Sequence, residues 1–219
     1  MNEVNSAKLD LDQGRGQNPD LAALICFLRS IEPLSAEVEL SLSQHMKQVS
    51  VRKRKKLLKE GAICQHIYFV VKGAVRGVIY DRKKDITTWI MVENQFLPSM
   101  GDFDEKNPVI EYIQALENSE LLAITLEDLD TLFKKHSETI ILARKILQHH
   151  YAEVQRRAFV TRLNKAENRY RHFLIYYPEL AYRIQLKYIA SFLGTTLETL
   201  SRIRKKVVRS PPIPLHMSA

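Results

Sequence analysis

The sequence predicts an α+β protein in three parts: an N-terminal β-roll of the jelly-roll kind, a long helix, and a C-terminal helix-turn-helix domain. Short β-rich segments separated by polar turns fill residues 49–125, an apolar stripe at helical spacing follows over 138–158, and two short helical patterns meet at Gly194. Many short strands with polar turns are typical of a barrel or roll. The 219 residues, 45% of them hydrophobic, suffice for one good core and a second, smaller domain.

Composition excludes several classes of protein. No apolar run reaches the roughly 20 residues of a membrane span, and residues 1–20 do not resemble a signal peptide, so we expect a cytoplasmic protein with no membrane partner. Cys26 and Cys64 are too few and too isolated for a zinc or iron-sulfur site. We find no nucleophile paired with a base and no phosphate-cradling glycine motif. The sequence therefore predicts no metal, no cofactor and no catalytic residue.

The first part of the chain predicts a disordered tail over residues 1–19 and a sensor-like roll over residues 20–135. Asp20 and Ser35 are candidate caps of two entry helices, and Thr125 is a candidate cap of a short closing helix. Between these helices, runs rich in β-branched and aromatic residues predict five strands. They cover residues 49–51, 67–71, 75–80, 86–92 and 121–125.

Five consecutive basic residues, Arg52 to Lys56, interrupt the roll. Such a run can contact nucleic acid or act as a localisation signal, but more often it is a solvated strand edge that its own charge keeps unpaired. The sequence favours the solvated edge and leaves the nucleic-acid contact as the alternative.

Residues 136–160 predict a dimerisation helix. Apolar residues recur there at three- or four-residue steps and form one stripe: Ile140, Ala143, Leu147, Tyr151 and Val154. The stripe is longer than one small roll needs, and a second copy of the chain is its natural partner. We therefore expect a homodimer.

Residues 161–208 predict the helix-turn-helix domain, followed by a Pro-rich flexible tail over residues 209–219. Asn164 is a candidate cap for the first helix of this domain, and Pro178 would stop it. Residues 183–186 are expected to form a brief strand before the helix pair.

The helix pair itself spans residues 186–205. Four residues of its first half, Leu186, Ile189, Ala190 and Leu193, stack on one side of a helix. Gly194 suits a left-handed turn, and either Thr195 or Thr196 can cap the next helix. In the second half, Leu200, Ile203 and Val207 would pack inward, which leaves Glu198, Arg202 and Lys205 on the outer face.

The excess positive charge of the chain lies around this helix pair. Residues 161–219 hold eleven Lys and Arg against three acids, whereas residues 1–160 hold 22 of each. A localised excess of positive charge beside a helix-turn-helix indicates binding to a polyanion. The carboxylate and the cations on the outer face are groups that can read base edges in a major groove. The sequence therefore predicts binding to double-stranded DNA.

Two motifs together resemble the Crp/Fnr family of bacterial transcription regulators. They are G-x(5)-I-Y-F-V-V-K-G-x-V at residues 61–75 and G-T-T-L-E-T-L-S-R-I at residues 194–203, and the resemblance spans residues 31–208. It implies a roll of the cyclic-nucleotide-binding type and a winged-helix-like reading domain, here with a reduced wing because the chain ends soon after the reading helix. It also implies a homodimer on a near-palindromic DNA site, with half-sites about 34 Å apart and RNA polymerase as a partner.

The family's pattern G-x-S-R-E-T-V-S-R implies which residues touch DNA. Its Glu and last Arg, which contact bases, match Glu198 and Arg202, whereas Leu197 replaces its first Arg. We place Thr196, Thr199 and Ser201 near bases or backbone, and expect phosphate contacts from Lys187, Arg204, Lys205 and Lys206. If Thr195 were the cap, Glu198 would serve a capping box instead; the family pattern favours Thr196.

The family's cyclic-AMP binders resemble F-G-E-[LM] followed by R-[ST]-A, and the corresponding stretch departs from this pattern. Gly101, Asp102 and Phe103 are the candidate effector pocket, but the position of the phosphate-binding Arg falls among residues 109–111, which are Val, Ile and Glu. Residues 100–112 carry four acids and one Lys, so we expect repulsion of a cyclic phosphate. The sequence thus predicts a regulator that does not respond to cyclic AMP and whose effector is unknown. The alternative is a ligand-binding regulatory module that acts through protein partners.

Overall fold

The computed structural model describes residues 19–82, 84–97 and 108–209. The chain divides into two compact units. Among the described residues, the roll unit comprises residues 19–79, 89–97 and 108–148, and the C-terminal unit comprises residues 80–82, 84–88 and 149–209. The candidate effector pocket at residues 101–103 lies outside the described residues, as do residues 1–18 and 210–219 of the two expected tails.

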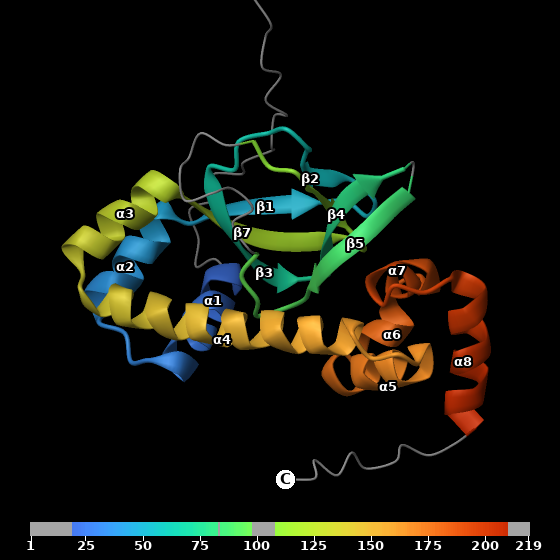
Figure 1. Ribbon diagram of the computed structural model, residues 1–219. Coiled ribbons are helices and arrows are strands. Elements are labelled where there is room, and N and C mark those ends of the chain that lie inside the picture. Colours follow the sequence, from blue (N-terminus) through green and yellow to red (C-terminus); the bar gives the residue numbers. More distant parts are fainter. Residues whose placement is uncertain (1–18, 83, 98–107, 210–219) are drawn as a thin grey trace, which may run out of the picture. The chain divides into compact units, whose positions relative to one another are not determined.

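The roll consists of two antiparallel sheets (Figure 1). One sheet has the strand order β1-β7-β3 and the other β2-β6-β4-β5. The strands are β1 (Lys47–Val51), β2 (Lys56–Leu58), β3 (His66–Lys72), β4 (Val75–Asp81), β5 (Lys84–Met91), β6 (Tyr112–Ala115) and β7 (Ser119–Thr125). The five expected strands are confirmed, and β2 and β6 are additional.

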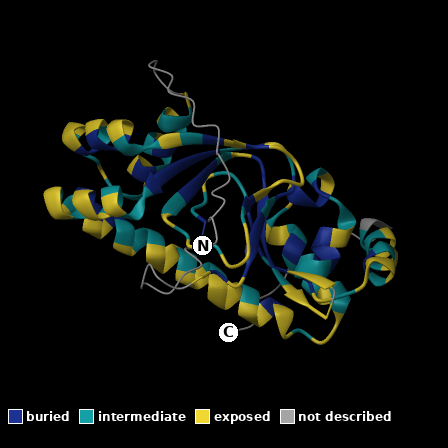
Figure 2. Cartoon of the chain, turned by 90° about the horizontal axis from the view of Figure 1, so that it is seen from above, coloured by how far each residue is buried: buried dark blue, intermediate teal, exposed yellow. Residues whose placement is uncertain are grey.

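The three-stranded sheet is buried on both faces, because alternate side chains enter two different clusters. Leu121 and Ala123 of β7 join Trp89 in the interior of the roll. Leu122, between them, packs with Phe69 of β3 beneath the helices. Figure 2 shows the strands of the roll largely dark blue, whereas the helices carry much of the exposed surface. The core of the roll unit therefore extends through both layers.

Four helices cover the outer face of this sheet. They are α1 (Pro19–Ile31), α2 (Ala36–His45), α3 (Leu126–Lys135) and the first part of α4 (Glu138–Thr161). The Ser35 hydroxyl accepts from the Val38 amide at 3.3 Å and caps α2, and the Thr125 hydroxyl accepts from the Asp128 amide at 3.0 Å and caps α3. Both caps are as predicted. Asp20 is not a cap, because α1 already begins at Pro19, whose fixed φ suits the first helical position.

The C-terminal unit contains the end of α4 and four further helices. They are α5 (Ala166–Tyr176), α6 (Leu180–Arg183), α7 (Leu186–Phe192) and α8 (Leu197–Arg209). Their shared core includes the buried side chains of Tyr170, Phe173, Ile189, Leu193 and Leu200.

Two sequence predictions in this unit are wrong. The strand over residues 183–186 does not form: the chain winds into α6 and buries Leu180, Ala181 and Ile184 against the helices instead. Asn164 does not cap α5, which begins at Ala166 after Lys165 without a side-chain cap. None of the helices in the described part of the chain has the length and apolar character needed to cross a lipid bilayer.

Candidate nucleic-acid interface

The turn between α7 and α8 closes as a Schellman motif. The Thr195 amide donates to the Ala190 carbonyl at 2.9 Å, and the Gly194 amide donates to the Ser191 carbonyl at 3.2 Å. Gly194 has φ +59°, the left-handed conformation that glycine adopts without steric cost. The turn over residues 193–196 therefore joins the two helices without a long loop, and its glycine is at the predicted position.

Thr196 is the cap of α8. Its hydroxyl accepts from the Thr199 amide at 3.2 Å, and its carbonyl accepts from the Leu200 amide at 3.0 Å. A hydrogen bond from its own backbone amide lowers the pKa of Glu198, with smaller contributions from the Thr196 hydroxyl and the Arg202 charge. The carboxylate of Glu198 thus lies ionised at the exposed first turn of α8, where it remains an acceptor.

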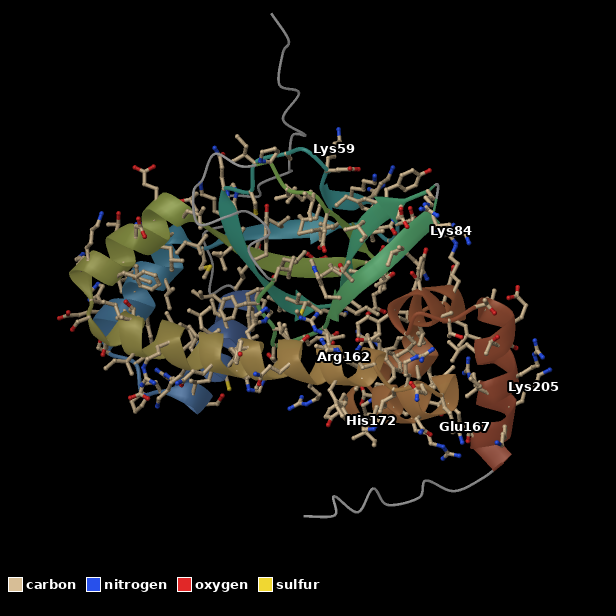
Figure 3. All side chains as sticks on the ribbon, viewed as in Figure 1. Lys59, Lys84, Arg162, Glu167, His172 and Lys205 are labelled. Atoms are coloured by element: carbon tan, nitrogen blue, oxygen red, sulfur yellow. The ribbon has the colours of Figure 1, made fainter. Side chains whose placement is uncertain are left out.

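One face of α8 is buried and the opposite face is exposed. Leu200 is fully buried and Ile203 is half-buried, whereas Glu198, Arg202 and Lys205 are exposed. These three follow one another at four and three residues and so lie along one side of the helix. We refer to them as the outer row. Figure 3 shows Lys205 extending from α8 on the side away from α5.

The other residues expected to contact DNA differ in how far their side chains are already engaged in contacts within the protein. The guanidinium of Arg204 lies over the Tyr182 ring at 5.5 Å, and the Lys187 ammonium lies 4.9 Å from the centre of the neighbouring Tyr188 ring. Lys206 is engaged, because its ammonium donates to the Glu167 carboxylate on α5 at 2.8 Å. Thr199 and Ser201 are half-buried on α8.

Glu167 links two helices of the C-terminal unit. Besides Lys206 of α8, it accepts from Arg171 of α5 at 2.9 Å. The hydrogen bond from Lys206, and then that from Arg171, lowers the pKa of Glu167. Four residues are expected to contact phosphates: Lys187, Arg204, Lys205 and Lys206. Lys206 already forms an ion pair with a carboxylate, that of Glu167.

Arg169 of α5, one of the eleven basic residues of the C-terminal part, has a structural role that the sequence does not indicate. Its guanidinium donates to the Leu193 carbonyl at 2.8 Å and to the Leu163 carbonyl at 2.6 Å, with longer contacts to the carbonyls of Asn164 and Gly194. It therefore ties the segment before α5 to the turn of the helix pair. No spacing in the sequence indicates this role, because the four carbonyls belong to two distant segments.

In the roll, the position expected for a phosphate-binding Arg holds a buried carboxylate. Val109 is buried and Ile110 is exposed, while Glu111 points inward and accepts from the Trp89 indole N–H at 2.8 Å. A side chain at Gly77 would overlap both Trp89 and the Glu111 carboxylate, so glycine is required there. An indole and a carboxylate thus fill this part of the interior.

The stripe on α4 is largely exposed in the single chain. Ile140 is 53% exposed, Leu147 60%, Tyr151 63% and Val154 40%, while Ala143 is half-buried. This row of large apolar side chains is available for a further contact. Among the described residues, no cluster of three His, Cys, Asp or Glu side chains could hold a metal ion.

Comparison with known proteins places these features in context. Residues 48–136 match the model of the cyclic nucleotide-binding domain. FixK2 from Bradyrhizobium japonicum is 19% identical over 75% of this chain and 85% of its own, with a TM-score of 0.63. The c-di-GMP responsive global regulator CLP from Xanthomonas campestris is 19% identical over 80% of this chain and 92% of its own, with a TM-score of 0.63.

A mutant of CooA from Carboxydothermus hydrogenoformans is 16% identical, covers 81% of both chains and has a TM-score of 0.62. No curated protein matches the sequence. At these identities the likeness establishes a shared fold, and it confirms the α+β class with a roll followed by C-terminal helices.

Proposed function

We propose that this chain, which has the fold of Crp/Fnr-type regulators and a cyclic nucleotide-binding domain in its roll, is a homodimeric transcription regulator that reads DNA through α8. The observation that carries the proposal is the outer row. It presents an ionised acceptor and two cations on one exposed face of a helix whose opposite face is anchored in a core.

The chemistry of the outer row fits base recognition. A guanidinium such as that of Arg202 can donate two hydrogen bonds to the O6 and N7 atoms of guanine, and a carboxylate such as that of Glu198 can accept from the cytosine amine. Leu197 is 44% exposed beside them and offers only apolar contact, for example to a thymine methyl group. We therefore expect a half-site in which G·C pairs face Arg202 and Glu198.

Phosphate contacts would position this helix. Lys187, Lys205 and Arg204 lie on the two helices of the pair, and hydroxyls of Thr196, Thr199 and Ser201 can donate to the DNA backbone. Lys206 would have to leave Glu167, or to share its ammonium, before it could contact a phosphate. The contribution of Lys206 is therefore the smallest that we expect among the cations of α8.

The α4 stripe supports the homodimer. A two-fold dimer would bury Leu147 and Tyr151 against their copies and would present two reading helices to successive major grooves. The site would then be near-palindromic. RNA polymerase follows as a partner if the protein acts as the Crp/Fnr family does.

The roll does not suit cyclic AMP. The carboxylate of Glu111 lies buried beside Trp89, where the family pattern implies a cation for the cyclic phosphate. A carboxylate at that position repels the negative charge of a phosphate, where a cation would attract it. We propose that the regulator does not respond to cyclic AMP, whatever other effector its roll binds.

The proposal is tested with Arg202→Ala and the matched control Arg162→Ala. Arg162 is an exposed arginine of the same unit, directly after the end of α4, and its removal changes the net charge equally. We expect Arg202→Ala to reduce the preference for a cognate over a scrambled duplex by about 1–3 kcal/mol, the usual value of a bidentate base contact. Arg162→Ala should leave that preference unchanged, even if overall affinity falls slightly.

Equal discrimination by wild type and Arg202→Ala would remove α8 from the reading role. If the wild-type protein bound no duplex at low salt, the ligand-binding module that acts through protein partners would be the better account.

A further inference from the structure

The five consecutive cations of the roll unit, Arg52 to Lys56, form an exposed and rigid turn that the reading function does not use. We call it the basic turn. It connects β1 to β2, the edge strands of the two sheets, and all five side chains are exposed. Its position between two strand edges agrees with the solvated-edge interpretation of the sequence. Its backbone, however, is more constrained than an ordinary solvated loop.

Hydrogen bonds on both sides fix the backbone of the basic turn. The Lys53 amide donates to the Asn118 side chain at 2.9 Å, and the Arg54 amide donates to the Ala115 carbonyl at 2.8 Å. The Ala115 amide donates to the Lys55 carbonyl at 3.0 Å, and the Gln114 side chain donates to the Arg54 carbonyl at 3.1 Å. The turn is thus tied to β6 and to the loop that follows it, so its cations project from a preorganised scaffold.

The backbone of Arg54 has a conformation that arginine rarely adopts. Its φ is +69°, in the left-handed region where glycine and asparagine are the usual occupants. An arginine there costs stability that a glycine would not. Backbone strain of this kind concentrates at functional sites, and here it holds a guanidinium at the tip of the turn.

The cations of the turn lack acidic partners within the described part of the chain. Among the described residues, no ion pair joins a carboxylate to Arg52, Lys53, Arg54 or Lys55. Lys56 differs, because its ammonium lies 3.7 Å from the centre of the Tyr112 ring. Since residues 1–160 are neutral in total, four such cations on one turn are a marked local concentration of charge.

The composition of the turn favours phosphate over a protein surface. Protein interfaces are centred on apolar or aromatic anchors, and no exposed large apolar side chain occurs among residues 47–60. Guanidinium and ammonium groups without such an anchor suit phosphate oxygens, with which arginine makes bidentate hydrogen bonds. Because hydrogen bonds already fix the backbone of the turn, binding costs little backbone entropy.

We propose that the basic turn is a second DNA-binding surface, which contacts the phosphate backbone of the duplex outside the two half-sites and without sequence preference. This inference rests on the proposed function, because it requires that the helix pair first place the protein on DNA. It assigns to the roll unit a direct part in affinity in addition to any effector that it binds.

The test compares full-length variants on two duplexes that share the palindromic site recovered from a random pool by the wild-type protein. One duplex is about 25 bp, enough for two half-sites one helical turn apart, and the other extends it with unrelated flanks to about 60 bp. Lys53→Gln/Lys55→Gln removes two cations whose side chains do not hold the turn. Arg54→Gly removes a third cation, and glycine readily adopts the positive φ of this position. Lys134→Gln/Lys135→Gln, at the exposed end of α3, is the control with the same loss of charge.

We expect the salt dependence of binding to separate these proteins. On the long duplex, the plot of log K against log salt should be less steep for Lys53→Gln/Lys55→Gln and for Arg54→Gly, by about 0.9 for each phosphate that the variant no longer neutralises. The α3 control should match wild type on the long duplex, and all four proteins should agree on the short one.

Equal slopes for wild type and the basic-turn variants on the long duplex would overturn the inference and leave the proposed function intact. A reduced transcriptional output with unchanged DNA affinity would also overturn it, because the turn would then bind an acidic protein. If the wild-type protein bound neither duplex, both the inference and the proposed function would fail.

Discussion

At the scale of single residues, the guanidinium of Arg169 holds the helix pair to the segment that precedes α5. It donates to carbonyls of Leu163 and Leu193, which are 30 positions apart in the numbering but lie against the same side chain. Carbonyls at the end of α7 also carry the negative pole of that helix, which favours a cation beside them. Arg169 therefore holds the turn between α7 and α8 to the segment that precedes α5.

Replacing Arg169 should destabilise the C-terminal unit. We expect Arg169→Met to lower its free energy of unfolding by about 2 kcal/mol, the usual loss for hydrogen bonds made by a charged group. Arg169→Lys should retain less than half of this stabilisation, because an ammonium group cannot make the same set of hydrogen bonds as a planar guanidinium. Helical circular dichroism in a urea titration measures both, with the exposed Arg162→Met as control. A transition of Arg169→Met that superimposes on wild type would contradict this role.

Glu111 leads to a prediction on ligand binding. Trp89 is the only tryptophan of the chain, and its indole donates to the Glu111 carboxylate in the roll interior. Because that carboxylate stands where a cyclic phosphate needs a cation, we expect cyclic AMP to produce no saturable heat at micromolar concentration and no change in tryptophan emission. A saturable micromolar isotherm would show that the roll accommodates the phosphate despite Glu111.

At the scale of elements, α4 carries the most conspicuous unpartnered surface. Leu147 and Tyr151 are each at least 60% exposed in the single chain, and burying such side chains contributes about 1.5–3 kcal/mol apiece. The double variant Leu147→Glu/Tyr151→Glu should therefore convert the protein from dimer to monomer while both units remain folded.

Sedimentation or light scattering measures this change, and DNA affinity should fall with it because a monomer spans one half-site. His149→Glu is the control: its side chain is 76% exposed and, two residues from Leu147, lies on another side of the helix. A Leu147→Glu/Tyr151→Glu protein that remained dimeric would place the interface elsewhere.

The sequence predicted those elements that carry strong local signals. Ser35 and Thr125 cap helices as expected, and the glycine at 194 closes the turn between α7 and α8. The strands β2 and β6 are three and four residues long and were not predicted: β2 begins at the last residue of the basic run, and β6 begins in the stretch compared with the cyclic-AMP pattern. The strand expected at residues 183–186 does not form, because α6 includes Arg183 and Ile184 is buried among the helices.

Of the candidate nucleic-acid interface, the sequence could predict only which residues share a face of a helix. The outer row follows from the positions of Leu200 and Ile203, which face the core. The Glu167–Lys206 bond joins residues 39 positions apart, and the Trp89–Glu111 bond joins residues 22 apart. No local pattern specifies such pairs, because they depend on how the elements pack.

At the scale of the whole molecule, the outer row of α8 and the basic turn are two exposed surfaces with positive charge and different chemistry. The outer row of α8 combines Arg202 and Lys205 with an acceptor, the combination that distinguishes bases. The basic turn carries cations alone, which bind phosphate without distinguishing sequence. If both proposals hold, α8 supplies sequence specificity and the basic turn supplies sequence-independent affinity.

The central claim is that two copies of α8 read a duplex as a symmetric pair. Selection of bound duplexes from a random pool by the full-length protein tests it most directly, since the recovered sequences report symmetry, spacing and base preference together. We predict an inverted repeat whose half-sites are centred about one helical turn, ~34 Å, apart, with G·C pairs facing Arg202. Recovery of no enriched sequence, or of a single site without a symmetric counterpart, would contradict it.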